Sequence, residues 1–178
     1  FSEDIYTDAK SPLEAILDSE NNQGTVTGIN LKIPKEKLGS GYLNSRNFLS
    51  VASCGICGKQ DLDPPSPTVE KLSDMEMSVD TIQQMFTSMN SGQKTFKQSG
   101  GSHAASAFDL NGKQLSIMED IGRHNAVDKV IGDLIMNGTL DEAKCVTVSG
   151  RISYEIIVKV FRARIPLLAA VSAPSSLA

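Results

Sequence analysis

The alternation of strand and helix patterns in the second half of the chain constrains its fold more than any other feature. Residues 114–121, 145–149 and 167–171 have the composition of short strands. Between them, residues 125–137 and 154–163 carry apolar side chains at helical spacing. This order is typical of parallel strands that are covered on both faces and joined by right-handed crossovers. The sequence therefore predicts an α/β fold, a three-layer sandwich with one antiparallel hairpin.

A further helix and a hairpin strand are predicted just upstream. Apolar side chains recur at helical spacing over residues 79–89, with Ser78 or Asp80 as N-cap and Gly92 past the end. Residues 104–110 are expected to pair with the strand that follows them. The intervening Asn-Gly dipeptide tolerates positive φ and supports a two-residue hairpin turn.

The chain divides into three parts by composition. Residues 1–62 form an N-terminal segment with a strand predicted over residues 25–33, and residues 63–77 form a proline-rich linker. Residues 78–178 form the α/β domain. Because the chain begins at Phe1, we interpret it as a fragment of a longer protein.

Charge and cysteine content narrow the class of protein. A formal net charge of -4 and a pI near 5.2 argue against nucleic acid binding, which relies on clustered Lys and Arg. Three cysteines, an odd number, do not make the disulfide framework of a small secreted protein, and this favours a reducing compartment. No apolar run approaches the roughly 18 residues of a membrane span. We therefore expect a cytoplasmic protein without nucleic acid or membrane partners.

Cys54 and Cys57 form a Cys-x-x-Cys pair in a glycine-rich segment that predicts a loop. From the residues alone, three interpretations stay open. A structural zinc site needs two more ligands, and the candidates His103, His124 and Cys145 are scattered along the chain. A thioredoxin-like dithiol is expected at the start of a helix, where the helix dipole lowers the thiol pKa. The third interpretation is a nucleophile that carries sulfur as a persulfide, for which a loop is suitable.

Three polar segments of the α/β domain, residues 120–125, 149–153 and 172–176, are candidate binding loops, because ligands of such folds bind beyond the carboxyl ends of the strands. A fourth candidate is residues 99–104, where backbone amides of the glycine pair can approach an anion at the entry to a strand. Glycine amides, serine hydroxyls and helix starts can bind phosphate, and arginine can add two parallel hydrogen bonds. Residues 149–153 and 172–176 together predict a cradle for a polyphosphate or nucleotide. The candidate residues are Gly101, Ser102, His103, Gly122, Arg123, His124, Asn125, Ser149, Gly150, Arg151, Ser172, Ser175 and Ser176.

Five motifs in this order resemble the FdhD family of formate dehydrogenase accessory sulfurtransferases. Together they cover residues 53–176 and are far more specific than any one of them. The matching segments are Ser53-Cys54-Gly55-Ile56-Cys57-Gly58-Lys59, Gly100-Gly101-Ser102-His103-Ala104-Ala105, Glu119-Asp120-Ile121-Gly122-Arg123-His124-Asn125-Ala126-Val127-Asp128-Lys129, Ser149-Gly150-Arg151 and Ser172-Ala173-Pro174-Ser175-Ser176.

The resemblance implies a sulfurtransferase that takes persulfide sulfur from a cysteine desulfurase. It implies delivery to the molybdenum bis-guanine-dinucleotide cofactor for the formate dehydrogenase apoenzyme. Cys54 would be the persulfide carrier, Cys57 an assisting residue, and no metal would be resident. The guanine nucleotide ends of the cofactor, which GDP can mimic, would lie in the crevice formed by the four loops. The family fold is similar to that of cytidine deaminases.

Other functions stay open. A non-catalytic chaperone would bind the molybdenum cofactor without transferring sulfur, and a zinc-binding regulatory module would hold about one zinc ion per chain. Deaminase activity is not expected, because the HxE and PCxxC zinc signature is absent. The apolar helix faces are compatible with a homodimer. Segments that the family normally carries before and after this region are not present, so part of the cofactor site is expected to lie outside this chain.

Overall fold

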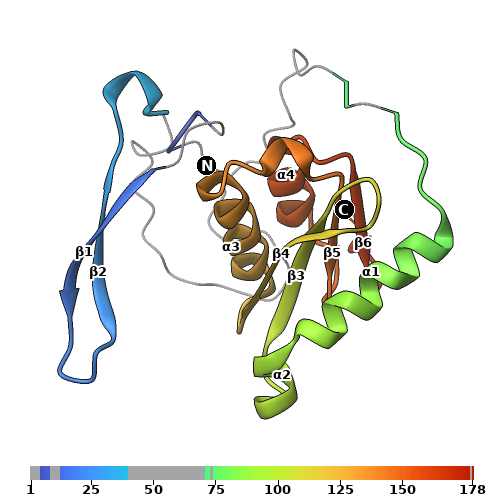
Figure 1. Cartoon of the computed structure of the whole chain (residues 1–178), viewed down its shortest axis with the longest axis horizontal. Coiled ribbons are helices and arrows are strands. Elements are labelled where there is room, and N and C mark those ends of the chain that lie inside the picture. The colour runs from blue at the N-terminus through green and yellow to red at the C-terminus, as the bar shows by residue number, and fades with distance from the viewer. Residues whose placement is uncertain (1–4, 9–12, 40–70, 73, 177) are drawn as a thin grey trace.

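The computed structural model describes residues 5–8, 13–39, 71–72, 74–176 and 178 (Figure 1). These residues form two sheets and four α-helices. The strands are β1 (Glu14–Glu20), β2 (Val26–Lys32), β3 (His103–Phe108), β4 (Gln114–Asp120), β5 (Cys145–Val148) and β6 (Leu167–Ala170). The helices are α1 (Val79–Gly92), α2 (Lys94–Ser99), α3 (Arg123–Met136) and α4 (Tyr154–Arg162), with 3-10 turns η1 (Lys35–Lys37) and η3 (Leu140–Glu142).

The larger sheet has the strand order β4-β3-β5-β6. Strand β3 runs antiparallel to both of its neighbours, whereas β5 and β6 run parallel. Strands β4, β5 and β6 therefore point in the same direction, as the alternation of strands and helices predicts. The position of β3 between β4 and β5 was not predictable, because the hairpin motif pairs β3 with β4 but leaves its other neighbour open.

Helices cover both faces of this sheet. On one face, α3 and α4 share a buried cluster with Ala105 of β3 and Val148 of β5. On the opposite face, Met85 of α1 packs with Phe108 and Cys145. The α/β class and its three layers are therefore present as predicted, while the similarity to cytidine deaminases stays a prediction.

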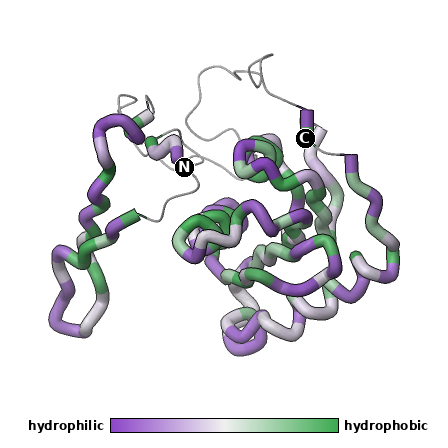
Figure 2. The backbone as a smooth tube through the Cα atoms, turned by 45° about the horizontal axis from the view of Figure 1, so that its top comes forward, coloured by the Kyte–Doolittle hydropathy of each residue, from purple (hydrophilic) through white to green (hydrophobic). Residues whose placement is uncertain are grey.

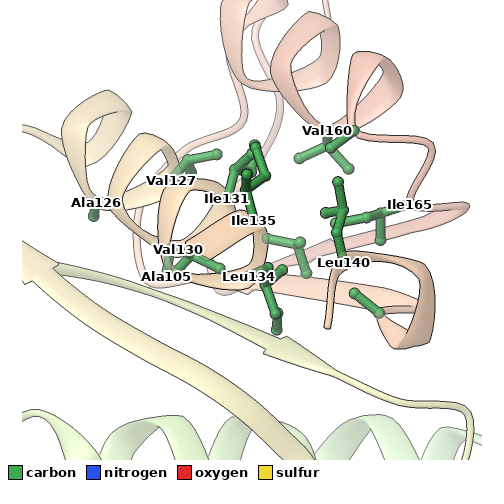
Figure 3. Close-up of a cluster of buried hydrophobic side chains, with 14 of the residues drawn as sticks. Ala105, Ala126, Val127, Val130, Ile131, Leu134, Ile135, Leu140, Val160 and Ile165 are labelled. Carbon is green, nitrogen blue, oxygen red and sulfur yellow. The ribbon is translucent and has the colours of Figure 1, made fainter. Parts of the chain in front are cut away.

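The core between α3 and the sheet combines branched aliphatic side chains on the helix with alanines on β3 (Figure 3). Val127, Val130 and Leu134 are fully buried and belong to the same cluster as Ala105 and Ala107. Small side chains on the strand let the helix approach closely and the larger ones fill the remaining space. Burial of each such Val or Leu side chain stabilises the fold by roughly 1.5–3 kcal/mol. The loops that extend from the ends of these strands are therefore anchored to a well-packed core.

The hairpin between β3 and β4 is present, but the predicted two-residue turn is wrong. The connection runs over residues 109–113, and only Gly112 in it has a positive φ, of 82°. The Asp109 carboxylate accepts the N–H groups of Asn111 (2.8 Å) and Lys113 (2.9 Å). This side chain stabilises a longer turn than the Asn-Gly pair alone would need.

Some helix boundaries differ from the predicted ones. Helix α3 begins at Arg123 after the N-cap Gly122, so Arg123 and His124 lie in its first turn rather than in a loop. Ser78 is the N-cap of α1, as predicted, but the helix continues through Gly92. Helix α2 was not predicted, because its six residues carry no apolar periodicity.

Strands β1 and β2 form a separate antiparallel hairpin, which lies apart from the α/β body (Figure 1). Strand β2 confirms the strand predicted over residues 25–33, whereas β1 was missed because its apolar residues do not alternate. Leu17 and Ile29 pair across the hairpin and are 60% and 59% exposed. Figure 2 shows hydrophobic stretches in this hairpin as well as in the α/β body. Tyr6, by contrast, is buried in the same cluster as α3.

The predicted boundary at residues 63–77 lies largely outside the described residues and stays a prediction. The same holds for the loop predicted around Cys54 and Cys57. Within the part of the chain that the structure describes, no helix is long and apolar enough to cross a membrane.

Candidate functional site

The four candidate binding segments of the α/β domain lie at one edge of the larger sheet. His103 begins β3 and pairs with Asp120, which ends β4. Ala105 pairs with Val148 at the end of β5, and Val148 pairs with Ala170 at the end of β6. The amino end of β3 and the carboxyl ends of the other three strands therefore meet. We call this edge, with the loops that extend from it, the loop edge.

A cavity of about 690 Å³ opens at the loop edge, on the face covered by α1 and α2. Its volume is in the range of small-molecule sites, which is about 300–1,000 Å³. Four predicted binding residues line this edge cavity: Gly101, Ser102, His103 and Ser149. The other lining residues are Phe86, Thr87, Met89, Asn90, Gln93, Phe96, Gly100 and Val171. Sequence reasoning assigned none of the α1 and α2 residues to a binding site, since polar positions on an amphipathic helix usually face solvent and apolar positions usually pack in the core.

Glu119 connects the start of α2 to the glycine-histidine segment. Its Oε2 accepts the N–H of Thr95 (2.7 Å), and its Oε1 accepts the N–H of Phe96 (2.8 Å) and the hydroxyl of Ser102 (2.9 Å). Burial raises the pKa of Glu119, but these hydrogen bonds outweigh it and hold the pKa below its usual value. Sequence reasoning noted Glu119 only as part of a polar motif and assigned it no binding role.

Gly150 is where three of the predicted motifs meet. A Cβ atom at this position would lie 3.2 Å from His103 Nδ1 and 3.3 Å from Arg123 Cδ. Ser149, the residue before it, accepts the N–H of Ala104 through Oγ (2.9 Å). The absence of a side chain at Gly150 therefore lets the histidine of one motif and the arginine of another pack against the same loop.

Asp120 fixes the turn between β4 and α3. Its Oδ1 accepts the N–H of Gly122 (2.8 Å) and the side-chain amide of Asn125 (3.1 Å), and its Oδ2 lies 2.6 Å from Lys129 Nζ. Burial raises the pKa of Asp120, but Lys129 and the other two donors outweigh it and lower the pKa overall. Asn125, predicted as a binding residue, therefore supports the conformation of this turn.

His124 is joined to the start of α4. Its Nε2 is 2.7 Å from Ser153 Oγ, the N-cap of α4, and 3.5 Å from a carboxylate oxygen of Glu155. Burial, followed by the positive charges of Arg123 and Lys159, lowers the pKa of His124 to about 4. The imidazole is therefore neutral near pH 7. His103 lines the edge cavity, whereas His124 does not.

The remaining predicted residues lie on the surface beside the edge cavity. Arg151, Ser172, Ser175 and Ser176 are all exposed, and none of them lines that cavity. The N–H of Ser175 donates to the carbonyl of Ile152 (2.9 Å), so the loops after β5 and β6 lie side by side. The structure thus separates the predicted binding residues into three groups: one lines the edge cavity, one lies exposed on the adjoining surface, and one packs or forms hydrogen bonds around the start of α3 and Gly150.

The cysteines fall into two classes. Cys54 and Cys57, predicted as the catalytic pair, lie outside the described residues. Cys145 is fully buried, and burial raises the pKa of its thiol to about 12. Cys145 begins β5, at the opposite end of that strand from the loop edge where His103 lies, so the two are not joint metal ligands. Among the described residues, no three His, Cys, Asp or Glu side chains are grouped to hold a metal ion.

Comparison with known proteins identifies relatives over most of the chain. The FdhD/NarQ family model matches residues 1–178. A protein named sulfur carrier protein FdhD from Sulfolobus acidocaldarius is 44% identical over 137 residues, which cover 76% of this chain and 53% of the relative. A protein of the same name from Mycolicibacterium paratuberculosis is 45% identical over 142 residues, which cover 75% of this chain and 51% of the relative.

A solved structure is also similar. The crystal structure described as a formate dehydrogenase accessory protein from Desulfotalea psychrophila superposes with a TM-score of 0.55 at 28% sequence identity. The superposition covers 61% of this chain and 46% of that one. The chain spans about half the length of the curated relatives it matches. Since the family model matches from the first residue to the last, the chain belongs to the FdhD/NarQ family.

Proposed function

We propose that this chain is part of a cytoplasmic sulfurtransferase in which Cys54 carries sulfur as a persulfide. A cysteine desulfurase supplies the sulfur, and the molybdenum bis-guanine-dinucleotide cofactor of formate dehydrogenase receives it. The observation that carries the proposal is the match over the whole chain to a family whose relatives are named sulfur carrier proteins.

The loading step uses ordinary thiol exchange. The Cys54 thiolate attacks the outer sulfur of the donor's cysteine persulfide, so that an S–S bond to Cys54 forms while the S–S bond of the donor breaks. The donor cysteine leaves as a thiolate, and no external oxidant or reductant is consumed. Cys57, the neighbouring thiol, assists this transfer of sulfur to Cys54. Cys145 is not a candidate carrier, because its buried thiol stays protonated at neutral pH.

The loop edge supports binding of the nucleotide part of the cofactor. Ser102, His103 and Ser149 bring hydrogen-bonding side chains to a cavity large enough for a nucleotide. Arg123 and Arg151 add positive charge at the same edge, which favours phosphate. In the proposed complex, the guanine nucleotide ends lie at the loop edge and the reactive part of the cofactor lies within reach of Cys54.

A chaperone that binds the cofactor without transferring sulfur is the alternative. The two functions differ in their dependence on Cys54. In cells that lack the natural protein, a full-length Cys54→Ala variant should fail to restore formate dehydrogenase activity, and Cys145→Ala should restore it. Restoration by Cys54→Ala at normal protein levels would favour the chaperone. Zinc analysis of the purified protein tests the third possibility, since a zinc module requires about one ion per chain.

A further inference from the structure

Gln93 occupies an unusual position between α1 and α2. The residue is 6% exposed and lines the edge cavity. It stands at the N-cap position of α2, yet its side chain makes no capping hydrogen bond. Its amide also has no hydrogen bond to another residue in the described ranges. The Gln93 amide is not among the fully enclosed polar groups that lack a partner in the described part of the chain. An amide carries two donors and one acceptor with two lone pairs, which a ligand in the edge cavity can satisfy.

Glu119 explains why the Gln93 side chain is not used as a cap. The first N–H groups of a helix need acceptors, which the N-cap side chain commonly supplies. In α2, the N–H groups of Thr95 and Phe96 both donate to Glu119 instead. The same carboxylate holds Ser102 on another wall of the cavity. Glu119 therefore fixes two walls at once and leaves the Gln93 amide available to a ligand.

The surroundings of Gln93 define the chemistry of that ligand. Phe86, Met89 and Phe96 supply aromatic and apolar surface to the same cavity. Flat apolar surface beside one planar amide suits a planar ring that carries a hydrogen-bond donor next to an acceptor. Nucleobases have such edges. The serine, histidine and glycine residues on the other wall suit the attached phosphates.

We infer that Gln93 is a specificity-determining residue that binds the base of a nucleotide in the edge cavity, and that Glu119 is the positioning residue that holds it there. The inference rests on the proposed function for the identity of the nucleotide, a guanine nucleotide. It adds the α1–α2 wall, which none of the predicted binding motifs includes, as the part of the site that recognises the base.

The test compares ligands with and without a base. In the full-length protein, the affinity for GDP is measured by calorimetry. The affinity for inorganic pyrophosphate is measured by its competition with labelled GDP. The variant Gln93→Leu removes the amide while keeping a side chain of similar size. We expect it to weaken GDP binding by about 10- to 100-fold, the effect of losing buried hydrogen bonds, and to change pyrophosphate binding by less than about 2-fold. Gln84→Leu, at an exposed glutamine of α1 outside the cavity lining, is the matched control and should change neither.

Glu119→Gln tests the positioning role. The substitution keeps the shape of the side chain but turns one acceptor into a donor that faces N–H and O–H donors. GDP binding should weaken by about 10-fold, beyond any effect of lost stability. Asp133→Asn is the matched control, since Asp133 accepts the Ser116 hydroxyl (2.6 Å) near the other end of β4. It should lower stability to a similar degree and leave GDP affinity unchanged.

Two results would overturn the inference: GDP binding that is unaltered in Gln93→Leu, or GDP and pyrophosphate weakened equally by it. Failure of the wild-type protein to bind GDP would also overturn it. Sulfur loading of Cys54 by a desulfurase is measured on the same samples and involves no base recognition. Loss of loading in the wild type would therefore contradict the proposed function, whereas normal loading with unaltered GDP binding in Gln93→Leu would contradict only the inference.

Discussion

Gly150 packs directly against His103, with the position of a Cβ only 3.2 Å from the imidazole Nδ1. A Gly150→Ala substitution should therefore displace His103 and Arg123 by a few tenths of an ångström and weaken GDP binding several-fold. Gly132→Ala in α3 is the control, since a Cβ there meets no atom within 4 Å. It should raise stability by about 0.5–1 kcal/mol, because alanine favours a helix over glycine. Calorimetry measures the GDP affinity of Gly150→Ala, and urea unfolding measures the stability of Gly132→Ala. Undiminished GDP affinity in Gly150→Ala would contradict the close packing.

The lowered pKa of His124 predicts how stability depends on pH. Its folded-state pKa of about 4 lies below its ordinary value of 6.5. Between these values the unfolded chain binds a proton that the folded chain does not. The free energy of unfolding should therefore fall as the pH drops from about 6.5 to 4, by an order of 1–3 kcal/mol from this group. The difference between wild type and His124→Gln, measured by urea unfolding across this range, isolates the contribution from those of the carboxylates. Parallel pH profiles for the two proteins would show that His124 is not buried as described.

The pair of Lys159 and Asp128 links α4 to α3. Lys159 Nζ lies 2.8 and 2.7 Å from the two carboxylate oxygens, and the lysine is almost completely buried. Asp128→Asn should lower the free energy of unfolding by roughly 1–3 kcal/mol, because it weakens the charge-assisted hydrogen bonds that a buried ammonium group makes to Asp128. The double variant Asp128→Leu with Lys159→Met should recover most of this loss. Urea unfolding measures both, and a double variant no more stable than Asp128→Asn would contradict this explanation.

The thiol of Cys145 should be chemically silent in the folded protein. It is fully buried against Met85 and Phe108, and its pKa is raised to about 12, so almost no thiolate forms at pH 8. Iodoacetamide should label Cys145 only after unfolding in urea, as peptide mapping by mass spectrometry would show. Labelling of Cys145 in the native protein at the rate of a free thiol would contradict its burial.

The elements that the sequence predicted well are those with strong local patterns. The helix over residues 154–163 and the strands over residues 145–149 and 167–171 match α4, β5 and β6 within about one residue. Each has either a complete apolar face or a continuous apolar run. The loops that follow these strands were expected at one sheet edge on general grounds of α/β topology, and they lie there.

The features that sequence reasoning missed depend on contacts between distant residues. Helix α2 is stabilised by Glu119, whose carboxylate accepts two of its N–H groups across 23 and 24 positions of sequence. The burial of Gln93 follows from the packing of α1 and α2 around the edge cavity and has no local signature. The insertion of β3 between β4 and β5 is likewise a matter of pairing between strands far apart in the chain. The separation of Arg151 and Ser172 from the edge cavity could not be seen before the loops were placed.

Intact-protein mass spectrometry can detect the persulfide on Cys54 itself. The full-length protein is incubated with a cysteine desulfurase and cysteine, together with Cys54→Ala, Cys57→Ala and Cys145→Ala. We expect that the wild type and Cys145→Ala gain the mass of one sulfur atom, that dithiothreitol removes it, and that Cys54→Ala gains none. The behaviour of Cys57→Ala shows whether the second thiol is required for loading. Equal gain by Cys54→Ala, or no gain by the wild type beside an active desulfurase, would contradict the assignment of Cys54 as the sulfur carrier.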